Sequence, residues 1–291
     1  TLYVQLNGLD AQSRILNNSL EDFSQALQLT RSRYEGQIAS ELDLTRAQNQ
    51  LAQAKAQLDE VRGQRNLTEH AIGELVGVAA SDFTLPASQQ LIALPGIPSQ
   101  LPSHLLQRRP DIAAAERRVF AANANIGVAK AAWYPDFSLT GLIGGQTQGV
   151  GNLLSAGNRY WALGPLMDLP IFDGGRLSAN ERQAKAEFEQ ASAQYRSQVL
   201  KAVREVEDNL AQLRDLQQEA QDEQAAADAA LHTQALAMNS YQAGAVSYLD
   251  VVTAQTATLQ AQMTLQTVQT RQLQASVGLV TALGGGWQPG A

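Results

Sequence analysis

An internal repeat constrains this chain more than any other feature. A motif containing Tyr34, Ser40, Leu42, Asp43, Ala47 and Gln48 returns as Tyr241, Ser247, Leu249, Asp250, Ala254 and Gln255, at a constant offset of 207 residues (from 34 to 241). After each copy, apolar and small residues recur at alternating steps of three and four, which is typical of a coiled-coil seam. The repeat therefore predicts two helix–turn–helix hairpins of similar build.

The same periodicity predicts helices over residues 1–34, 41–76, 110–132 and 176–239, with a further helix after Ser247. The stretch 176–239 has no proline, and its 64 residues would extend roughly 96 Å as a helix. Ser40 and Ser247 are predicted to cap the returning helices, with Asp43 and Asp250 in their first turns. Helices of this length do not fit inside a compact globular domain.

Two segments depart from the helical pattern. Residues 136–148 and 159–172 alternate in the manner of strands and flank a Gly-rich loop, so each is predicted to be a strand of about 13 residues. The predicted organisation is given by residue ranges: 1–77 first hairpin, 78–110 connector, 111–135 helix leading to the strands, 136–175 two strands and their loop, 176–284 second hairpin, 285–291 tail.

Composition excludes several functional classes. The chain has no cysteine, and its three histidines (His70, His104 and His232) lie far apart, so no metal site, cofactor or enzymatic activity is expected. The net charge of −7, with no basic cluster, argues against nucleic acid. No apolar run is long enough for a membrane-spanning helix.

The first residues already follow a helical pattern with no N-cap before them, so we expect the chain to be truncated at its N-terminus. If the repeat continues upstream, a second pair of strands precedes Thr1. Four antiparallel strands cannot close a barrel alone, but several protomers together can. The repeat therefore predicts a cyclic oligomer.

Several ordered motifs carry a family resemblance: Leu101-Pro-Ser-His-Leu-Leu-Gln-Arg-Arg-Pro-Asp-Ile112, Ala121-Ala-Asn-Ala-Asn-Ile-Gly127, Trp133-Tyr-Pro135, Leu169-Pro-Ile-Phe-Asp-Gly-Gly-Arg176 and Leu283-Gly-Gly-Gly-Trp287. With the repeat, they cover nearly the whole chain. The sequence resembles the TolC-type outer-membrane efflux factors, and is most similar to the OprM/NodT-like branch that serves resistance-nodulation-division pumps.

The resemblance implies a mainly α fold with a small β part. Long antiparallel coiled-coil hairpins form an α-barrel in the periplasm, and the strands join a β-barrel shared by a homotrimer in the outer membrane of a Gram-negative bacterium. The implied function is a passive exit duct for drugs or other small molecules. The implied partners are further copies of the chain, a periplasmic adaptor, an inner-membrane pump and outer-membrane lipid.

The resemblance also implies site residues. Asp43 and Asp250 match aspartates that ring the periplasmic aperture, and Arg46 is placed to pair across the closed tip. Gly36, Gln37, Gly244 and Ala245 lie in the turns that meet the adaptor. The simpler interpretation of the aspartates is that they are helix N-terminal acids, and the simpler interpretation of Arg46 is that it is a solvated surface residue.

Two further alternatives stay open. A periplasmic coiled-coil adaptor or scaffold without a barrel would also carry long hairpins, and the segment 136–172 discriminates between the two functions. Trp133, Tyr134, Tyr160 and Trp161 flank the strands and fit either an interfacial aromatic girdle or packing where helix meets strand, with packing preferred for Trp133.

Overall fold

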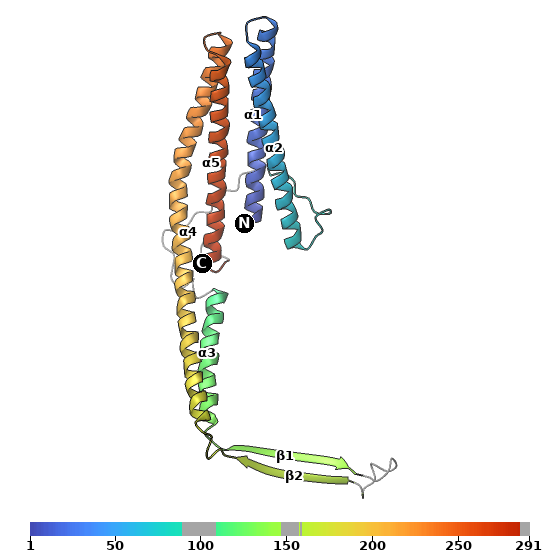
Figure 1. Cartoon of the computed structure of the whole chain (residues 1–291), viewed down its shortest axis with the longest axis vertical. Coiled ribbons are helices and arrows are strands. Elements are labelled where there is room, and N and C mark those ends of the chain that lie inside the picture. The colour runs from blue at the N-terminus through green and yellow to red at the C-terminus, as the bar shows by residue number, and fades with distance from the viewer. Residues whose placement is uncertain (89–108, 147–156, 158, 286–291) are drawn as a thin grey trace, which may run out of the picture. The chain divides into compact units, whose positions relative to one another are not determined.

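The computed structural model describes residues 1–88, 109–146, 157 and 159–285. Within them lie five helices and two strands (Figure 1): α1 (Leu2–Glu35), α2 (Glu41–Val76), α3 (Pro110–Ala131), β1 (Asp136–Gly145), β2 (Arg159–Asp168), α4 (Arg176–Gln242) and α5 (Tyr248–Ala282). The predicted helices are all present, with ends within three residues of those expected. Most of the predicted connector, residues 89–108, lies outside the described residues.

The chain divides into two compact units. One comprises Thr1–Pro102 with Arg204–Ala291, and the other comprises Ser103–Val203. The first unit therefore holds α1, α2, α5 and the C-terminal part of α4, and the second holds α3, the strands and the N-terminal part of α4. The helix α4 runs through both.

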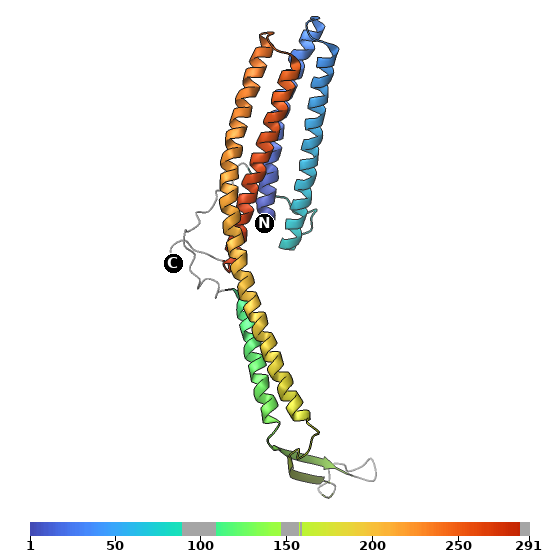
Figure 2. The ribbon, with the colours of Figure 1, turned by 60° about the vertical axis from the view of Figure 1, so that its left-hand side comes forward.

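In the first unit, α1 packs against both α2 and α5, which run alongside it (Figure 2). One cluster of buried side chains joins all three helices and includes Leu16, Phe23, Leu58 and Leu259. Burial of such side chains is the main stabilising contribution to helix packing. A second cluster, nearer the turns, joins Ala26, Ala47, Tyr241, Tyr248 and Val251.

Polar contacts join α4 to α5 along the second hairpin. Thr258 Oγ1 donates a hydrogen bond to the Ala230 carbonyl oxygen at 3.0 Å, and Gln272 Nε2 donates one to the Leu216 carbonyl oxygen at 2.8 Å. Gly278 lies so close to Asn209 that a Cβ there would be 2.5 Å from Asn209 Oδ1. The two helices thus approach closely where a side chain is absent.

The repeat is also seen in the backbone conformation at the end of the second helix of each hairpin. Gly77 (φ 77°) and Gly284 (φ 95°) both adopt the left-handed conformation. The Gly77 amide donates to the Glu74 carbonyl oxygen at 3.1 Å, and the Gly284 amide donates to the Thr281 carbonyl oxygen at 3.0 Å. Gly77 confirms the predicted C-cap, because glycine reaches this conformation without steric penalty.

A buried ion cluster anchors the start of the connector on the first hairpin. Arg65 Nε lies 2.6 Å from Asp10 Oδ1, and Arg65 Nη1 lies 3.0 Å from Glu69 Oε2. The same guanidinium donates to the Leu85 carbonyl oxygen, while Glu69 accepts from the Leu85 amide and Asp10 accepts from the Ser88 amide. Arg65 follows the three–four pattern of the sequence, but its partners were not predicted.

In the second unit, β1 and β2 form an antiparallel ribbon that pairs Asp136 with Asp168 and Gly145 with Arg159. Each strand has 10 residues rather than the predicted 13. β2 ends before Pro170, which has no amide hydrogen to continue a ladder, and the end predicted for β1 at Gln148 lies outside the described residues. None of the described helices combines the length and apolar character needed to cross a bilayer.

Candidate functional site at the hairpin tips

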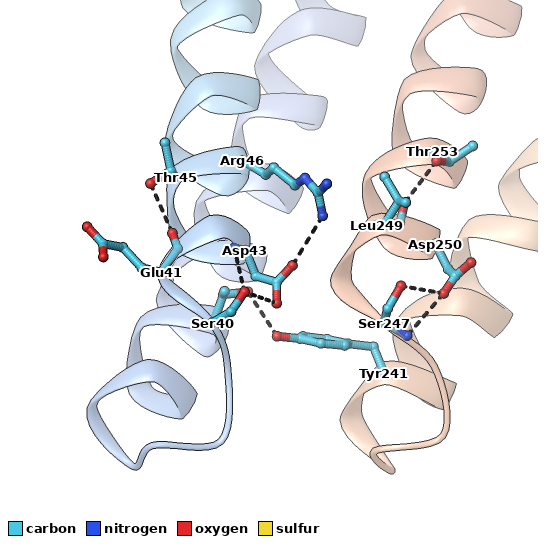
Figure 3. Close-up of polar contacts among 11 residues, drawn as sticks. Ser40, Glu41, Asp43, Thr45, Arg46, Tyr241, Ser247, Leu249, Asp250 and Thr253 are labelled. Carbon is cyan, nitrogen blue, oxygen red and sulfur yellow. Dashed lines mark hydrogen bonds and ion pairs between the residues drawn. The ribbon is translucent and has the colours of Figure 1, made fainter.

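The turns at 36–40 and 243–247, here called the tips, lie side by side at the same end of the first unit (Figure 3). Their backbone hydrogen bonds repeat at the offset of 207. The Gln37 amide donates to the Tyr34 carbonyl oxygen, and the Gly244 amide donates to that of Tyr241, both at 2.9 Å. The next amides, of Ile38 and Ala245, donate to Arg33 and Ser240 at 2.8 and 2.9 Å. One turn geometry serves both hairpins.

The left-handed residue of the first tip is Gln37, with φ 61°, and its counterpart Gly244 has φ 76°. Gly36 has φ −80°, a conformation open to any residue. Gly36 lies in the tip, as expected, and the left-handed position belongs to Gln37, which the repeat aligns with Gly244. The left-handed conformation raises the backbone energy of Gln37, because this residue has a Cβ. Gly244 has no Cβ and avoids this strain.

Asp43 is held by its own helix. Ser40 Oγ donates to Asp43 Oδ2 at 2.8 Å, and the Asp43 amide donates to Ser40 Oγ at 3.1 Å, which confirms the predicted cap. Arg46 Nη1 lies 3.5 Å from Asp43 Oδ1. The structure thus brings two of the predicted gate residues together within one helix, as a pair three residues apart.

Asp250 is held in a similar way but without the cation. Both the backbone amide and the hydroxyl of Ser247 donate to Asp250 Oδ2, at 3.0 and 2.8 Å. Thr253 occupies the position equivalent to Arg46 and donates to the Leu249 carbonyl oxygen. Within the described part of the chain, no ion pair neutralises Asp250. Among the described residues, Asp250 therefore lacks the neighbouring cation that Asp43 has.

Sequence analysis missed the contacts that join the two hairpins at the tips. The Arg33 guanidinium lies over the Tyr241 ring, 4.5 Å from its centre, and Arg33 Nη2 donates to the Gln242 carbonyl oxygen at 2.9 Å. The hydroxyls of Thr30 and Tyr241 are 3.3 Å apart. Because Thr30 donates its proton to the Ala26 carbonyl oxygen, Tyr241 is the donor in this pair. Tyr241 was visible in the sequence only as part of the repeat.

Tyr248 completes this contact. Its side chain is 1% exposed and meets the Tyr241 ring edge to face, with ring centres 5.5 Å apart. Burial, with smaller contributions from Tyr241 and from the Asp43 carboxylate, raises the pKa of Tyr248 to about 12. The influence of Asp43 indicates that the first-turn acid of one hairpin lies near a buried aromatic residue of the other.

The β ribbon presents two different faces, because side chains alternate along each strand and paired residues share a face. One face carries four apolar register pairs, Phe137–Met167, Leu139–Pro165, Gly141–Leu163 and Ile143–Trp161, and ends at the pair Gly145–Arg159. The other is mixed and includes Asp136–Asp168, Ser138–Leu166 and Thr140–Gly164. The large side chains of the apolar face are exposed in the single chain. An apolar face of this size requires a covering that the single chain does not provide.

The four aromatic residues predicted around the strands are all exposed, at 45% to 77%. Tyr160 lies over Gly144, so that a Cβ at Gly144 would be 2.7 Å from the Tyr160 hydroxyl. The pKa of the Glu181 carboxyl on α4 is lowered chiefly by a hydrogen bond from Lys185, and to a smaller extent by Trp133. The proximity of Trp133 to Glu181 favours helix packing for Trp133.

Comparison with known proteins gives the same assignment from three directions. A family model described as outer membrane efflux protein matches residues 101–285. The chain is 33% identical over 290 residues to the outer membrane protein OprJ of Pseudomonas aeruginosa, covering 99% of this chain and 60% of that protein. It is 35% identical to the pyoverdine export outer membrane protein OpmQ of Pseudomonas putida, covering 98% and 61%.

Solved structures are similar as well. The outer membrane protein VceC of Vibrio cholerae matches with a TM-score of 0.83 and 30% identity, covering 99% of this chain and 69% of that one. The outer-membrane channel OprN matches with a TM-score of 0.86 and 30% identity, covering 99% and 65%. The chain spans about three fifths of the length of the curated relatives that it matches. It belongs to the outer membrane efflux protein family.

Proposed function

We propose that the protein containing this chain is the outer-membrane channel of a tripartite efflux system: a passive exit duct with no enzymatic activity. The observation that carries the proposal is the β ribbon, which has one face that is apolar except for Arg159 at its end and one mixed face. Ten residues at about 3.3 Å each give strands of about 33 Å, which span about 25 Å when tilted by about 40°. That height fits the apolar band of a transmembrane barrel.

The two faces suggest an orientation for the ribbon. Phe137, Leu139, Ile143 and Trp161 would contact lipid, because the one charged side chain on that face, Arg159, lies at the last register pair of the ribbon. The opposite face would line the water-filled pore, where Asp136 and Asp168 can remain hydrated. A periplasmic adaptor without a barrel, the alternative function, gives no reason for such an exposed apolar face.

A ring of several copies is supported by the same ribbon and by the repeat, and the resemblance to TolC-type efflux factors implies that the ring is a homotrimer. Two strands leave both edges unpaired, and closure requires strands from elsewhere. The repeat gives a second argument, because Tyr241 is 4% exposed in its contact with the other hairpin whereas its counterpart Tyr34 is 40% exposed. In a ring of protomers, the face that bears Tyr34 would be covered by the second hairpin of the next copy.

The tips serve as the candidate gate of the duct. Asp43 and Asp250 lie in the first turns of the returning helices of the two hairpins (Figure 3), and the contact of Arg33 and Thr30 with Tyr241 holds the hairpins together. Opening would require these contacts to separate, with the second hairpin moving away from the first. The uncompensated charge of Asp250 would make the aperture selective for cations.

The tips are also the candidate contact for a periplasmic adaptor, which would link the duct to an inner-membrane pump. Gly36, Gln37, Gly244 and Ala245 form the turns, and beside them Ile38 and Leu42 are exposed at 76% and 59%. Exposed apolar side chains around a polar turn are typical of a surface that binds another protein. The similarity to efflux-pump components supports this arrangement.

The test is single-channel conductance of the reconstituted full-length protein. We expect Asp43→Ala combined with Asp250→Ala to raise the conductance, since the charges that constrict the aperture are removed. The matched control is Ser40→Ala combined with Ser247→Ala, which loosens the same helix ends and keeps both charges. Unchanged conductance in the aspartate variant, or the same increase in the serine variant, would remove the two carboxylates from the gate.

A further inference from the structure

Gln255 is a buried amide that the proposed function leaves unexplained. Its side chain is 1% exposed, and neither Nε2 nor Oε1 has a hydrogen-bond partner among the residues that the structure describes. Buried amides in proteins nearly always find partners, because the hydrogen bonds to water that they lose on burial must be replaced. An unsatisfied amide therefore raises the free energy of the state in which it is buried.

The position of Gln255 is the contact between the two hairpins, here called the seam. On α5, Val251 lies one turn before Gln255 and Leu259 one turn after it, on the same face of the helix. Val251 packs in the cluster that includes Ala26 and Ala47 of the first hairpin. Leu259 packs in the cluster that includes Phe23. Gln255 thus lies between two apolar clusters that both join the hairpins.

Two other polar pairs join the hairpins along the seam. Gln50 Nε2 donates to Thr256 Oγ1 at 3.0 Å, and Gln234 Nε2 donates to Asp22 Oδ2 at 3.0 Å. These bonds lie nearer the surface, where water replaces them at low net cost when the hairpins part. Gln255 differs, because separation of the hairpins would give its amide the partners that it lacks in the closed seam.

We propose that Gln255 destabilises the closed seam and so favours separation of the hairpins near the tips. With this buried amide, the closed seam has a higher free energy than it would have with an apolar residue. The inference rests on the proposed function only for its consequence in gating. The energetic role of Gln255 concerns the seam itself. A ligand or partner shifts a two-state equilibrium only by its differential affinity for the two states. When the closed and open states of the seam differ little in free energy, a partner with a small differential affinity is enough to open it.

The experiment is hydrogen–deuterium exchange on the detergent-solubilised full-length protein, read in peptides that cover residues 248–262. In Gln255→Leu, we expect local opening to become about tenfold rarer, because an apolar side chain of similar volume has no lost hydrogen bonds to recover. Gln255→Met, which keeps the unbranched shape, should slow exchange in the same direction and guards against poor fit of the leucine.

Gln272→Leu is the matched control. Gln272 lies on the same helix and is 6% exposed, but its amide is bound to the Leu216 carbonyl oxygen. Its replacement should speed exchange around residue 272 several-fold. If both variants at Gln255 exchange as fast as the unmodified protein, or faster, the amide is satisfied in the closed seam and the proposal is overturned. Exchange is measured whether or not the protein conducts, so a failure to form channels would contradict the proposed function alone.

Discussion

On the second helix of the first hairpin, Arg65 binds two buried carboxylates, whereas Gln272, 207 residues later, binds a backbone carbonyl oxygen. Glu69 has Ser276 as its counterpart, a buried hydroxyl without a partner among the described residues. Most backbone hydrogen bonds of the turns and helix ends nevertheless recur in both hairpins. The comparison teaches that the repeat preserves backbone geometry, whereas the buried polar side chains at equivalent positions differ in residue type and in their partners.

The tips differ in the same sense. Tyr241 is covered by Arg33 and Thr30 of the first hairpin, but Tyr34 has no equivalent cover in the single chain. Asp43 is paired with Arg46, but Asp250 is not paired with a cation in the described part of the chain. Two hairpins with one backbone are thus unequal in charge and in packing, and substitutions at equivalent positions should have unequal effects.

The largest expected effect is at Arg65. Arg65→Leu leaves Asp10 and Glu69 buried without their cation, so we expect the free energy of unfolding to fall by about 3–5 kcal/mol. Gln272→Leu, at the equivalent position, should cost only about 1 kcal/mol. Chemical denaturation measures both, with Arg62→Leu as control, because the ion pair of Arg62 with Asp59 is exposed. Equal losses at 65 and 272 would show that the ion cluster does not distinguish the hairpins.

The next effect concerns how closely the hairpins approach. A Cβ on Gly8 would lie 2.5 Å from Thr270 Oγ1, so Gly8→Ala should separate α1 from α5 and reduce stability by about 1–3 kcal/mol. Gly63→Ala is the control, because nothing lies within 4 Å of its added Cβ, and there alanine should stabilise the helix by up to about 1 kcal/mol. Thermal unfolding should move in opposite directions for the two variants, and a common direction would contradict the close contact.

A smaller effect is expected from exchanging the left-handed residues of the two tips. Gln37→Gly should raise the free energy of unfolding by up to about 1 kcal/mol, because glycine adopts φ 61° without strain. Gly244→Gln should lower it by a similar amount. The melting temperatures of the two variants and of the double variant measure the exchange. A loss of stability in Gln37→Gly would mean that the glutamine side chain makes a contact worth more than the strain.

The smallest effect at neutral pH is that of Tyr248. Its pKa is raised to about 12, above the ordinary value of about 10, so the folded state favours the neutral phenol. Its contribution is fully present below about pH 10 and is lost as the pH rises through the folded pKa. Exchange of the α5 tip should therefore accelerate between about pH 10 and 12, after correction for the intrinsic rate. The variant Tyr248→Phe should lack this acceleration, and Tyr34→Phe, at an exposed tyrosine, should keep it.

The helices and their ends were predictable because their signals are local. The three–four periodicity, Ser40, Ser247 and Gly77 act within one or two turns of the chain, and the repeat showed each signal twice. The two-stranded segment was predictable for the same reason, although its strands are shorter than expected. Which of the two turn residues, Gly36 or Gln37, adopts the left-handed conformation was not predicted, although the repeat aligns Gln37 with Gly244.

The buried ion cluster and the hairpin contacts could not be predicted in the same way. Asp10 and Arg65 are 55 residues apart, and Thr30 and Tyr241 are 211 apart, so their pairing depends on how the helices pack. One signal was available: Arg65 follows the three–four pattern of the second helix, whose other positions are mostly apolar or small. A charge at such a position needs a buried partner, and the sequence alone does not say which carboxylate provides it.

The attachment of Asp43 and Asp250 to the first turns of their own helices has a mechanical consequence. Each carboxylate accepts hydrogen bonds from a cap residue three positions earlier, so it has little freedom to swing on its side chain. If these acids surround an aperture, the position of their charge is set by the position of the helix, and the electrostatic width of the opening changes only when a whole hairpin moves. A glutamate at either position has one more methylene group, so its charge could move independently of the helix.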